Sequence, residues 1–464
     1  MWERIIVYSI LNKKYKLKIM LGRSIALLII LFPVLCFGQY SDNPGLRDMD
    51  RILPERERAS VVNKILEWRL DNIIPEIMNR EDIDMWLVMC RETNEDPVFW
   101  SMLPEPLFHA RRTTILVFHR KEDGSVARLS AGGSMGKWYK GTWSDRSKTQ
   151  FESLNDLILK LDPKTIGINE SPVHRSADGL SASLKQSLLD ELDKKYQDRL
   201  VSAENLCIGW LETRSPEELS IYRHLCGIAH ELIAEFYSNG VITPDITTTQ
   251  DVVWWIRDRI TELGLETWFQ PSIDVQRHPD LKEFYKDDPE VIRRGDVIHC
   301  DVGIVYLRLC TDMQWQAYVC HIGEGTVPAG LQKALDRAVD LADVLMGEFK
   351  QGLTGNEIGA NATKKAEAAG LRPQLYSHPI GFFGHSAGTS VDTRPASGQP
   401  PGFKQVMEYP MQYNTVYAIE FSATTAVPEW KGADVRISYE EQGVFTKNGC
   451  NWVDGNQTEF YLIK

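Results

Sequence analysis

Hydrophobic positions between residues 45 and 205 alternate between helical and strand-like spacing. Apolar side chains recur every three or four residues over 58–80, which predicts an amphipathic helix, and a second helix is expected over 151–161. Short apolar runs predict strands at 84–90, 113–119, 126–130 and 165–169. Because helices and strands alternate, we expect residues 45–205 to form an α/β domain.

The pattern changes near residue 212, where the start of a long helix is well marked. Ser215 is suited to cap this helix, Pro216 to be its first residue, and Glu218 to complete a capping box, so a helix should extend to about Ser238. Further helices are expected at 251–263 and 332–349, and strands at 296–304, 309–319, 415–426 and 434–446. We therefore expect residues 206–464 to form a second domain of the α+β class, with largely antiparallel strands.

The first forty residues differ in composition from the rest of the chain. Several basic residues precede an apolar run over 25–36, and Phe37-Gly38-Gln39 follows it. The run is shorter than the roughly 20 residues that span a bilayer, and Pro33 interrupts it. These features predict a signal peptide over residues 1–38, export to the periplasm or out of the cell, and no stable membrane span after its removal. A retained membrane anchor is the competing interpretation.

Composition and charge exclude some classes of protein. A chain of 464 residues with 43% hydrophobic and 25% charged residues is suited to two well-filled globular domains. The formal net charge of −12 argues against the basic face that nucleic acid requires, so no nucleic-acid partner is expected. The cysteines form no CxxC pair, and a disulfide framework is not expected. We therefore look for chemistry among the carboxylates and histidines.

Two aspartates, Asp301 and Asp312, flank a candidate β-hairpin. If the hairpin is centred between Tyr306 and Leu307, these aspartates become cross-strand partners with side chains on one face, roughly 5 Å apart. Two carboxylates so placed repel each other unless a cation or a proton lies between them. The Tyr-Leu corner is poor turn chemistry, and ordinary surface carboxylates are the simpler interpretation of this motif alone.

Two glutamates and one histidine strengthen the case for a metal site. Glu420 and Glu440 lie in apolar strand-like runs, where a carboxylate is costly unless it is paired or bound to metal. His378 lies in a segment bounded by Gly and Pro that reads as a loop, and alone it would be an ordinary loop histidine. Together with the two aspartates, these side chains suit a pair of divalent ions such as Mn²⁺ or Co²⁺.

The order of these motifs resembles that of a known metallopeptidase family. An Asp-x-Gly motif at 301–303, an aspartate eleven residues after the first, His-x-x-Gly at 378–381, Ile-Glu at 419–420 and a final strand glutamate resemble the family of aminopeptidase P, prolidase and methionine aminopeptidase. The N-terminal α/β domain resembles that of aminopeptidase P, prolidase and creatinase. The resemblance implies a pita-bread catalytic domain preceded by a creatinase-like N-terminal domain. It also implies two divalent metal ions, with manganese expected first and cobalt, iron or zinc as alternatives.

The same resemblance assigns roles to individual residues. The implied metal ligands are Asp301, Asp312, His378, Glu420 and Glu440. Glu420 would also shuttle a proton, and His385 would contact the substrate and steady the tetrahedral intermediate. His278 matches, more loosely, another histidine that contacts the substrate. Glu441 is adjacent to Glu440 and is an alternative last ligand.

The chain departs from the family pattern beside the expected metal site. Gln374 stands where aminopeptidase P carries a histidine, and Ser438 stands where the family commonly has an arginine. Arg436, two residues earlier, need not serve the role of that arginine. These changes leave the metal ligands intact and put the choice of substrate in doubt.

The expected activity is hydrolysis of the N-terminal X-Pro bond of small peptides, as in an Xaa-Pro aminopeptidase. Three alternatives stay open: an Xaa-Pro dipeptidase, a creatinase-like C–N hydrolase acting on a non-peptide substrate, and a binding homologue without turnover. Relatives often form dimers, so a homodimer is an expectation by analogy. Two divalent ions per chain would favour hydrolysis, and their absence would favour the creatinase-like or binding alternatives.

Overall fold

The computed structural model describes residues 47–395 and 403–464, and residues 46–464 group as one compact unit. The signal peptide predicted over residues 1–38 lies outside the described residues. Among the helices that are described, none combines the length and the apolar character that a membrane span requires.

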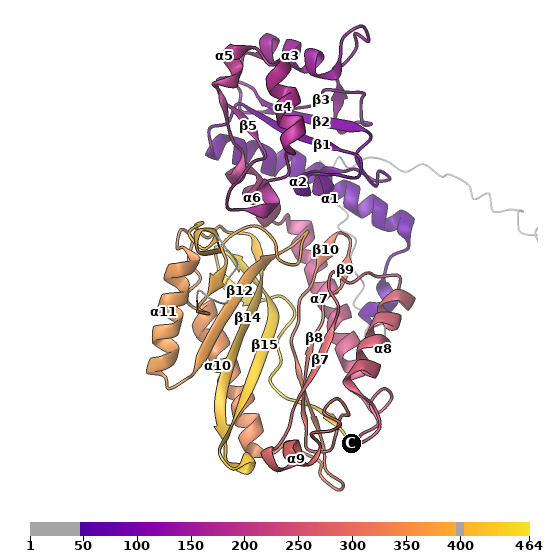
Figure 1. The fold of residues 1–464 in the computed structure, drawn as a ribbon, viewed down its shortest axis with the longest axis vertical. Helices are drawn as coiled ribbons and strands as arrows, with labels where there is room; N and C mark the ends of the chain where they lie inside the picture. Colours follow the sequence, from indigo (N-terminus) through magenta and orange to yellow (C-terminus); the bar gives the residue numbers. More distant parts are fainter. Residues whose placement is uncertain (1–46, 396–402) are drawn as a thin grey trace, which may run out of the picture. The chain divides into compact units, whose positions relative to one another are not determined.

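A six-stranded mixed sheet forms the centre of the N-terminal half (Figure 1). Its order is β4-β3-β2-β1-β5-β6, in which β1 pairs antiparallel with β2 and parallel with β5. Helix α1 (Glu55–Arg80) packs its apolar side chains against this sheet and confirms the helix predicted over 58–80. The strands are β1 (Met85–Arg91), β2 (Thr113–Arg120), β3 (Val126–Ser130), β4 (Lys140–Gly141), β5 (Ile166–Ile168) and β6 (Leu200–Ser202), and the other helices are α2 (Pro97–Met102), α3 (Gln150–Leu161), α4 (Ala182–Glu191), α5 (Lys194–Gln197) and α6 (Glu204–Glu212).

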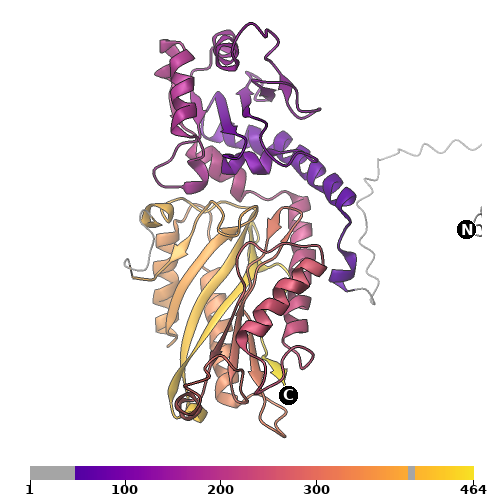
Figure 2. The ribbon, with the colours of Figure 1, turned by 45° about the vertical axis from the view of Figure 1, so that its right-hand side comes forward.

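Two largely antiparallel sheets form the second half, as Figures 1 and 2 show. The first has the order β17-β11-β8-β7 and packs against α7 and α8, and the second has the order β13-β12-β14-β15-β16 and packs against α10 and α11. The helices are α7 (Pro216–Phe236), α8 (Thr249–Glu262), α9 (Pro279–Phe284), α10 (Ala329–Met346), α11 (Gly355–Ala368) and α12 (Phe403–Val406). The strands are β7 (Ser272–Gln276), β8 (Val297–Asp301), β11 (Gln316–Val319), β12 (Pro373–Ile380), β13 (Val391–Asp392), β14 (Thr415–Val427), β15 (Ala433–Thr446), β16 (Gly449–Trp452) and β17 (Tyr461–Ile463). The two sheets with helices on their outer faces are the pita-bread fold that the resemblance implies.

Helix α7 begins at the predicted capping box, which also carries buried ion pairs. Ser215 Oγ accepts a hydrogen bond from the Glu218 amide at 3.0 Å, and the Glu218 carboxylate accepts one from the Ser215 amide at 2.7 Å. The guanidinium groups of Arg69, on α1, and Arg214 pair with this carboxylate at 2.8 and 3.0 Å. Because all three charged side chains are buried, loss of one partner would leave an uncompensated charge. The pairs therefore tie α1 to the start of α7.

The segments that carry the aspartates pair in a register different from the predicted one. Val302 pairs with Met313, so the residue opposite Asp301 is Gln314 and not Asp312. The difference is two residues, and side chains two apart along a strand point to the same face. Asp301 and Asp312 therefore share a face as predicted, although they are diagonal rather than direct neighbours.

The turn of this hairpin explains the difference in register. Strands β9 (Val305–Tyr306) and β10 (Leu309–Cys310) are joined by Leu307 and Arg308, with φ of 52° and 65°. Two successive residues with positive φ make the two-residue turn that matches the twist of a hairpin. Because such turns usually contain Gly, Asn or Asp, the residue types do not reveal this one.

His378 lies in a strand and not in a loop, which corrects the prediction for this segment. It is part of β12 and pairs with Ala418 of β14. The neighbouring β13 pairs only with Tyr376 and Ser377, so Pro379 lies beyond that edge ladder. Proline is tolerated where a strand has no ladder hydrogen bond to lose. The His-Pro pair is therefore compatible with a strand.

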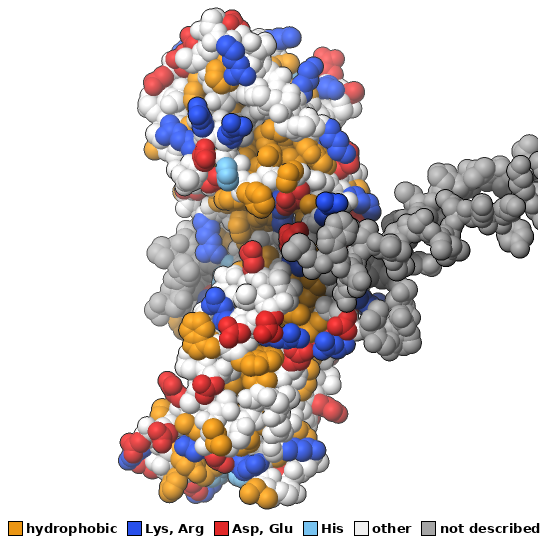
Figure 3. All heavy atoms as spheres, turned by 90° about the vertical axis from the view of Figure 1, so that its right-hand side faces the viewer, with side chains coloured by type: hydrophobic (Ala, Val, Ile, Leu, Met, Phe, Trp, Pro, Cys, Tyr) orange, Lys and Arg blue, Asp and Glu red, His pale blue; other side chains and the backbone are white. Residues whose placement is uncertain are grey.

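Charged and apolar side chains are interspersed on the face shown in Figure 3. The large apolar side chains that are exposed in the described residues include Phe108, Trp254, Phe284 and Ile322. These residues come from segments far apart in the sequence. Singly exposed apolar side chains are ordinary on protein surfaces and indicate no particular partner.

Candidate metal centre

The five predicted metal ligands converge between the two sheets of the second half. Ligand atoms of His378, Glu420 and Glu440 all lie within 4.8 Å of one another, and so do those of Asp301, Asp312 and Glu440. Glu440 belongs to both groups, so the five side chains form one cluster. We call this set of five residues the acidic cluster.

Backbone pairing between the two sheets brings the acidic cluster together. The amide of Gln314 donates to the Glu440 carbonyl at 3.1 Å, and the amide of Glu440 donates to the Gln314 carbonyl at 3.3 Å. This bridge joins the segment that carries Asp312 to β15. Within the second sheet, Glu420 and Glu440 are direct cross-strand partners on β14 and β15, so their side chains leave the same face.

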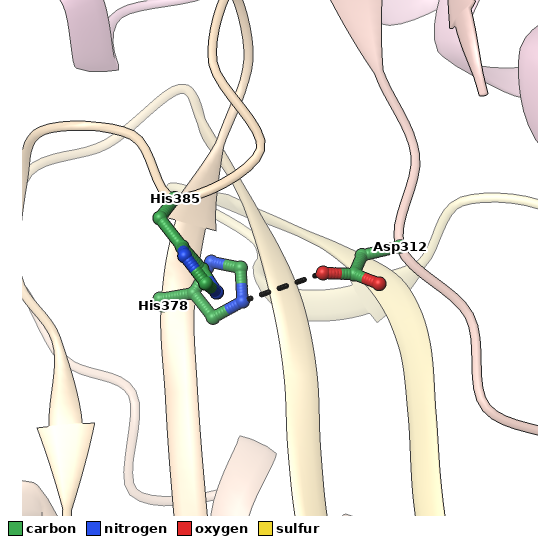
Figure 4. A group of neighbouring side chains, drawn as sticks. All are labelled: Asp312, His378 and His385. Carbon is green, nitrogen blue, oxygen red and sulfur yellow. Dashed lines mark ion pairs between the residues drawn. The ribbon is translucent and has the colours of Figure 1, made fainter. Parts of the chain in front are cut away.

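The imidazole of His378 points its Nε2 atom at the carboxylates of the acidic cluster, and Figure 4 shows its ion pair with Asp312. The Nε2 atom lies 3.8 Å from Asp312 Oδ2, 3.9 Å from Glu420 Oε2 and 3.6 Å from Glu440 Oε1. Nδ1 lies 3.1 Å from the carbonyl oxygen of Pro379, which can only accept a hydrogen bond. The proton is therefore assigned to Nδ1, and the lone pair of Nε2 faces the carboxylates, as in a metal-ligating histidine.

Several buried atoms of the acidic cluster have no hydrogen-bond donor. In the part of the chain that the structure describes, this is true of Asp301 Oδ1, Asp312 Oδ1, His378 Nε2 and Glu440 Oε1. Buried polar atoms are normally hydrogen-bonded, and here acceptors face acceptors. A divalent cation satisfies carboxylate oxygens and an imidazole lone pair together. The donor set therefore fits divalent metal ions.

Burial and neighbouring negative charges dominate the electrostatics of the acidic cluster. Burial, and then the charges of Glu440 and Asp301, raise the pKa of Asp312 well above its usual range. Burial, and then the charge of Glu440, raise the pKa of Glu420 in the same way. Burial lowers the pKa of His378 to about 4, which keeps the ring neutral. Each shift favours the uncharged form of a buried group, and a bound cation would reverse the carboxylate shifts.

His385, the predicted substrate-contacting histidine, lies beside the acidic cluster. Its ring centroid is 4.5 Å from that of His378, with an angle of 82° between the ring planes, and Figure 4 shows the two rings together with Asp312. The residue reaches solvent, but the protein atoms around the ring, and then the charge of His378, lower its pKa to about 3. A neutral imidazole that reaches solvent next to the cluster is placed to contact a bound ligand.

Glu440 and Glu441 point to opposite faces of β15. Glu440 faces the acidic cluster, whereas Glu441 Oε2 accepts hydrogen bonds from His230 Nε2 at 2.8 Å and from Trp315 Nε1 at 3.0 Å. Burial alone lowers the pKa of His230, but the charges of Glu441 and Asp454 raise it to about 10. Glu441 is therefore part of an ion pair with α7, and of the two glutamates only Glu440 reaches the cluster.

The structure does not bring His278 to the acidic cluster. Along the β7–β8 pair, Ser272 lies opposite Asp301 and Gln276 lies opposite Val297, so His278 follows the end of β7 remote from Asp301. Its Nδ1 accepts a hydrogen bond from the Asp280 amide at 3.2 Å and caps α9. His278, which matches the family pattern only loosely, thus serves as a helix cap in this structure.

Gln314 and His299 contribute to the site and were not predicted. The side-chain amide of Gln314 donates to Glu420 Oε1 at 3.0 Å and to Glu440 Oε2 at 2.7 Å, and its oxygen accepts from His299 Nε2 at 2.9 Å. These contacts orient both glutamates. Their spacing in the sequence could have indicated them. His299 lies two residues before Asp301, and Gln314 lies two residues after Asp312. Side chains two residues apart in extended chain point to the same face.

The two departures from the family pattern lie in one row of the second sheet. Gln374 pairs with Ser422, and Ser422 pairs with Ser438. The Gln374 side-chain oxygen accepts a hydrogen bond from Arg436 Nη2 at 3.3 Å, at an exposed position. The two positions at which the family pattern has a histidine and an arginine therefore lie in the same row of the sheet, and both carry other residues in this chain. Arg436 binds Gln374 at the surface.

Comparison with known proteins agrees with this geometry. Residues 220–446 match the sequence profile of metallopeptidase family M24. A methionine aminopeptidase from Thermococcus onnurineus (strain NA1) is 25% identical over 183 residues, which is 39% of this chain and 56% of that relative. The match thus spans little more than half of the relative's length.

Two solved structures resemble nearly the whole described fold. An X-Pro aminopeptidase from Thermotoga maritima MSB8 superposes with a TM-score of 0.58 at 16% identity, covering 83% of this chain and 99% of that one. An Xaa-Pro dipeptidase from Bacillus anthracis superposes with a TM-score of 0.56 at 12% identity, covering 86% and 99%. At such low identity these likenesses establish the fold.

Proposed function

We propose that this chain, which belongs to metallopeptidase family M24, hydrolyses the bond between an N-terminal residue and proline in small peptides. The observation that carries the proposal is the acidic cluster, whose buried acceptor atoms face one another without a donor. Similarity in fold to an X-Pro aminopeptidase and to an Xaa-Pro dipeptidase supports the proline preference. The N-terminal half supports it as well, because both likenesses extend over more than four fifths of the chain.

In this proposal the acidic cluster holds two divalent ions, with Mn²⁺ as the expected metal. The ligands are Asp301, Asp312, His378, Glu420 and Glu440. When bound, the ions supply Lewis acidity toward the scissile carbonyl and toward water.

The protein's own groups then carry the proton and position the substrate. Glu420 Oε2 accepts a proton from the attacking water and returns it to the leaving nitrogen. The other carboxylate oxygen of Glu420, Oε1, accepts a hydrogen bond from Gln314, which holds the side chain in place. His385, neutral and open to solvent, donates a hydrogen bond to the oxygen that gains negative charge. Gln314 keeps Glu420 and Glu440 in place throughout, because it binds both carboxylates.

An assay on a defined set of substrates tests this proposal. Purified protein with Mn²⁺ should cleave Xaa-Pro tripeptides or longer Xaa-Pro peptides and release the N-terminal residue. Asp301→Ala should abolish the activity, whereas Asp258→Ala, at an exposed position on α8, should leave it unchanged. Cleavage of Xaa-Pro dipeptides alone would indicate the dipeptidase alternative. Intact X-Pro substrates together with cleavage of creatine or of N-terminal methionine would contradict the proposed specificity.

We also propose that the protein is exported, on the basis of its N-terminal composition. Signal-peptidase cleavage would follow the apolar run 25–36, near Gly38. N-terminal sequencing of the protein from its native host should give Gln39 or a close neighbour as the first residue. An intact N-terminus in a membrane fraction would indicate the retained anchor instead.

A further inference from the structure

The indole ring of Trp268 fills a slot between two glycines of the candidate site. A Cβ atom at Gly384 would overlap the indole carbons Cε2 and Cζ2, and one at Gly303 would overlap Nε1. Neither glycine has a backbone conformation that requires glycine, so close neighbours account for both: the indole at Gly384, and the indole together with the Thr311 carbonyl and the Phe269 ring at Gly303. Gly303 follows Asp301 by two residues and Gly384 directly precedes His385. Trp268 therefore lies close to the backbone beside two site residues.

A hydrogen bond fixes the indole against the segment that carries the second aspartate. Trp268 Nε1 donates to the carbonyl oxygen of Thr311 at 2.8 Å, and Thr311 directly precedes Asp312. Phe269 packs edge-on against the indole, with ring centroids 4.5 Å apart. The indole is thus held by a hydrogen bond, an aromatic neighbour and two glycine backbones. It has little freedom to turn.

The imidazole of His385 has no hydrogen bond to orient it within residues 47–395 and 403–464. Its neighbours are aromatic rings: Trp268 at 5.2 Å with 77° between planes, His378 at 4.5 Å and Tyr376 at 6.2 Å. Edge-to-face contacts of this kind favour particular orientations of the two rings. Among these neighbours, Trp268 is also anchored by its hydrogen bond to the carbonyl oxygen of Thr311, directly before Asp312.

We propose that Trp268 is a positioning residue that orients His385 relative to Asp301 and Asp312. The imidazole of His385 packs against the immobile indole, and this contact sets the orientation of the imidazole. In other histidines a hydrogen-bonded carboxylate or carbonyl sets the orientation of the ring. The kinetic part of this inference rests on the proposed function, because it requires a reaction in which His385 contacts the substrate. The geometric part does not.

A double-mutant cycle tests the kinetic part. Trp268→Leu should lower kcat for Xaa-Pro hydrolysis about ten- to a hundredfold, with a smaller change in KM, because a displacement of about 1 Å can cost that much. In a His385→Ala background the same change should alter kcat less than about twofold. Equal losses in both backgrounds would overturn the proposal. Trp254→Leu, at an exposed tryptophan of α8, is the matched control and should leave both parameters unchanged.

Trp268→Phe provides a second variant if the leucine variant does not fold. It keeps an aromatic ring in the slot and loses the hydrogen bond to Thr311, so it should lower kcat by a smaller factor, about three- to tenfold. This loss should also disappear in the His385→Ala background. A loss that persists there would show that Trp268 acts on the fold and not through His385.

Nuclear magnetic resonance tests the geometric part without any activity. In protein labelled with ¹⁵N at histidine only, the His385 ring signal is identified by its absence in His385→Ala. It should shift in Trp268→Phe and stay unchanged in Trp254→Leu, because the indole ring current acts at 5.2 Å. An unshifted signal would overturn the proposal. A shifted signal in a protein that cleaves no X-Pro substrate would refute the proposed function and leave the positioning role standing.

Discussion

Replacement of Asp312 by asparagine should stabilise the metal-free protein. The Asp312 carboxylate is buried, and one of its oxygens lies within 4.8 Å of carboxylate oxygens of Asp301 and Glu440. At an effective dielectric constant of about 20, Coulomb's law gives roughly 3–4 kcal/mol for two full charges at that distance. Because protons shared among the carboxylates relieve part of this repulsion, the expected gain in free energy of unfolding is about 1–3 kcal/mol at pH 7.5.

Asp296→Asn is the matched control and should lower the free energy of unfolding instead of raising it. Asp296 is also a buried aspartate, but its two oxygens accept hydrogen bonds from Arg277 Nε and Nη2, both at 2.7 Å. Loss of that carboxylate charge leaves a buried guanidinium without a counter-ion, which costs about 3–5 kcal/mol. The same substitution at two buried positions should therefore stabilise one variant and destabilise the other.

Urea unfolding of EDTA-treated protein, followed by tryptophan fluorescence, measures both effects. Addition of Mn²⁺ should then stabilise the wild type, because a ligand that binds only the folded state raises its stability, and should have little effect on Asp312→Asn. If Asp312→Asn destabilises the metal-free protein as Asp296→Asn does, the carboxylate is a structural acceptor. The argument from unbalanced charge would then be refuted.

Three further predictions use neighbouring residues as controls. Glu440→Gln should weaken Mn²⁺ binding about a hundredfold or more in calorimetric titration. Glu441→Gln should leave Mn²⁺ binding within about threefold and should instead lower the stability of the protein. Equal effects of the two variants on binding would contradict the assignment of the two glutamates to opposite faces of β15. Because the pKa of His230 is raised to about 10, its ion pair is fully present below pH 6.5 and is lost as pH rises through 10. His230→Gln should therefore cost about 2 kcal/mol of unfolding free energy at pH 6 and almost nothing at pH 10.5, and a cost independent of pH would refute this. Glu218→Gln should lower the free energy of unfolding, measured in urea, by about 3–5 kcal/mol, because its ion pair is buried. Glu217→Gln should lower it by less than about 0.5 kcal/mol, because its partner Lys64 is exposed. Similar costs for the two variants would show that burial does not decide the strength of these ion pairs.

The long elements of the fold could be predicted because their signals are local. The capping box at Ser215 and Glu218 marks the start of α7, and the apolar spacing over 58–80 marks α1 to within three residues. Helix α11 (Gly355–Ala368) was not predicted. Its apolar side chains are mostly small, so its amphipathic pattern is weak although Thr354 and Glu357 form a capping box.

The carboxylates of the acidic cluster could be singled out because Asp and Glu are conspicuous in apolar strand-like runs, and the structure brings them together. The register between Asp301 and Asp312 could not, because it depends on a turn of Leu307 and Arg308 whose conformation those residue types do not indicate. The contacts of Gln314 depend on pairing with β15, more than a hundred residues away in the chain. Such long-range pairing leaves no mark in the local pattern, and neither does the slot that Trp268 fills.

The content of bound metal tests the central claim most directly. Metal-free protein dialysed to equilibrium against Mn²⁺, with the metal measured by mass spectrometry, should bind two ions per chain. His378→Ala, which removes the only imidazole of the acidic cluster, should reduce this number, and Glu441→Gln should not. If wild-type protein binds no Mn²⁺, Co²⁺, Fe²⁺ or Zn²⁺ above the level of His378→Ala, the acidic cluster is not a metal centre.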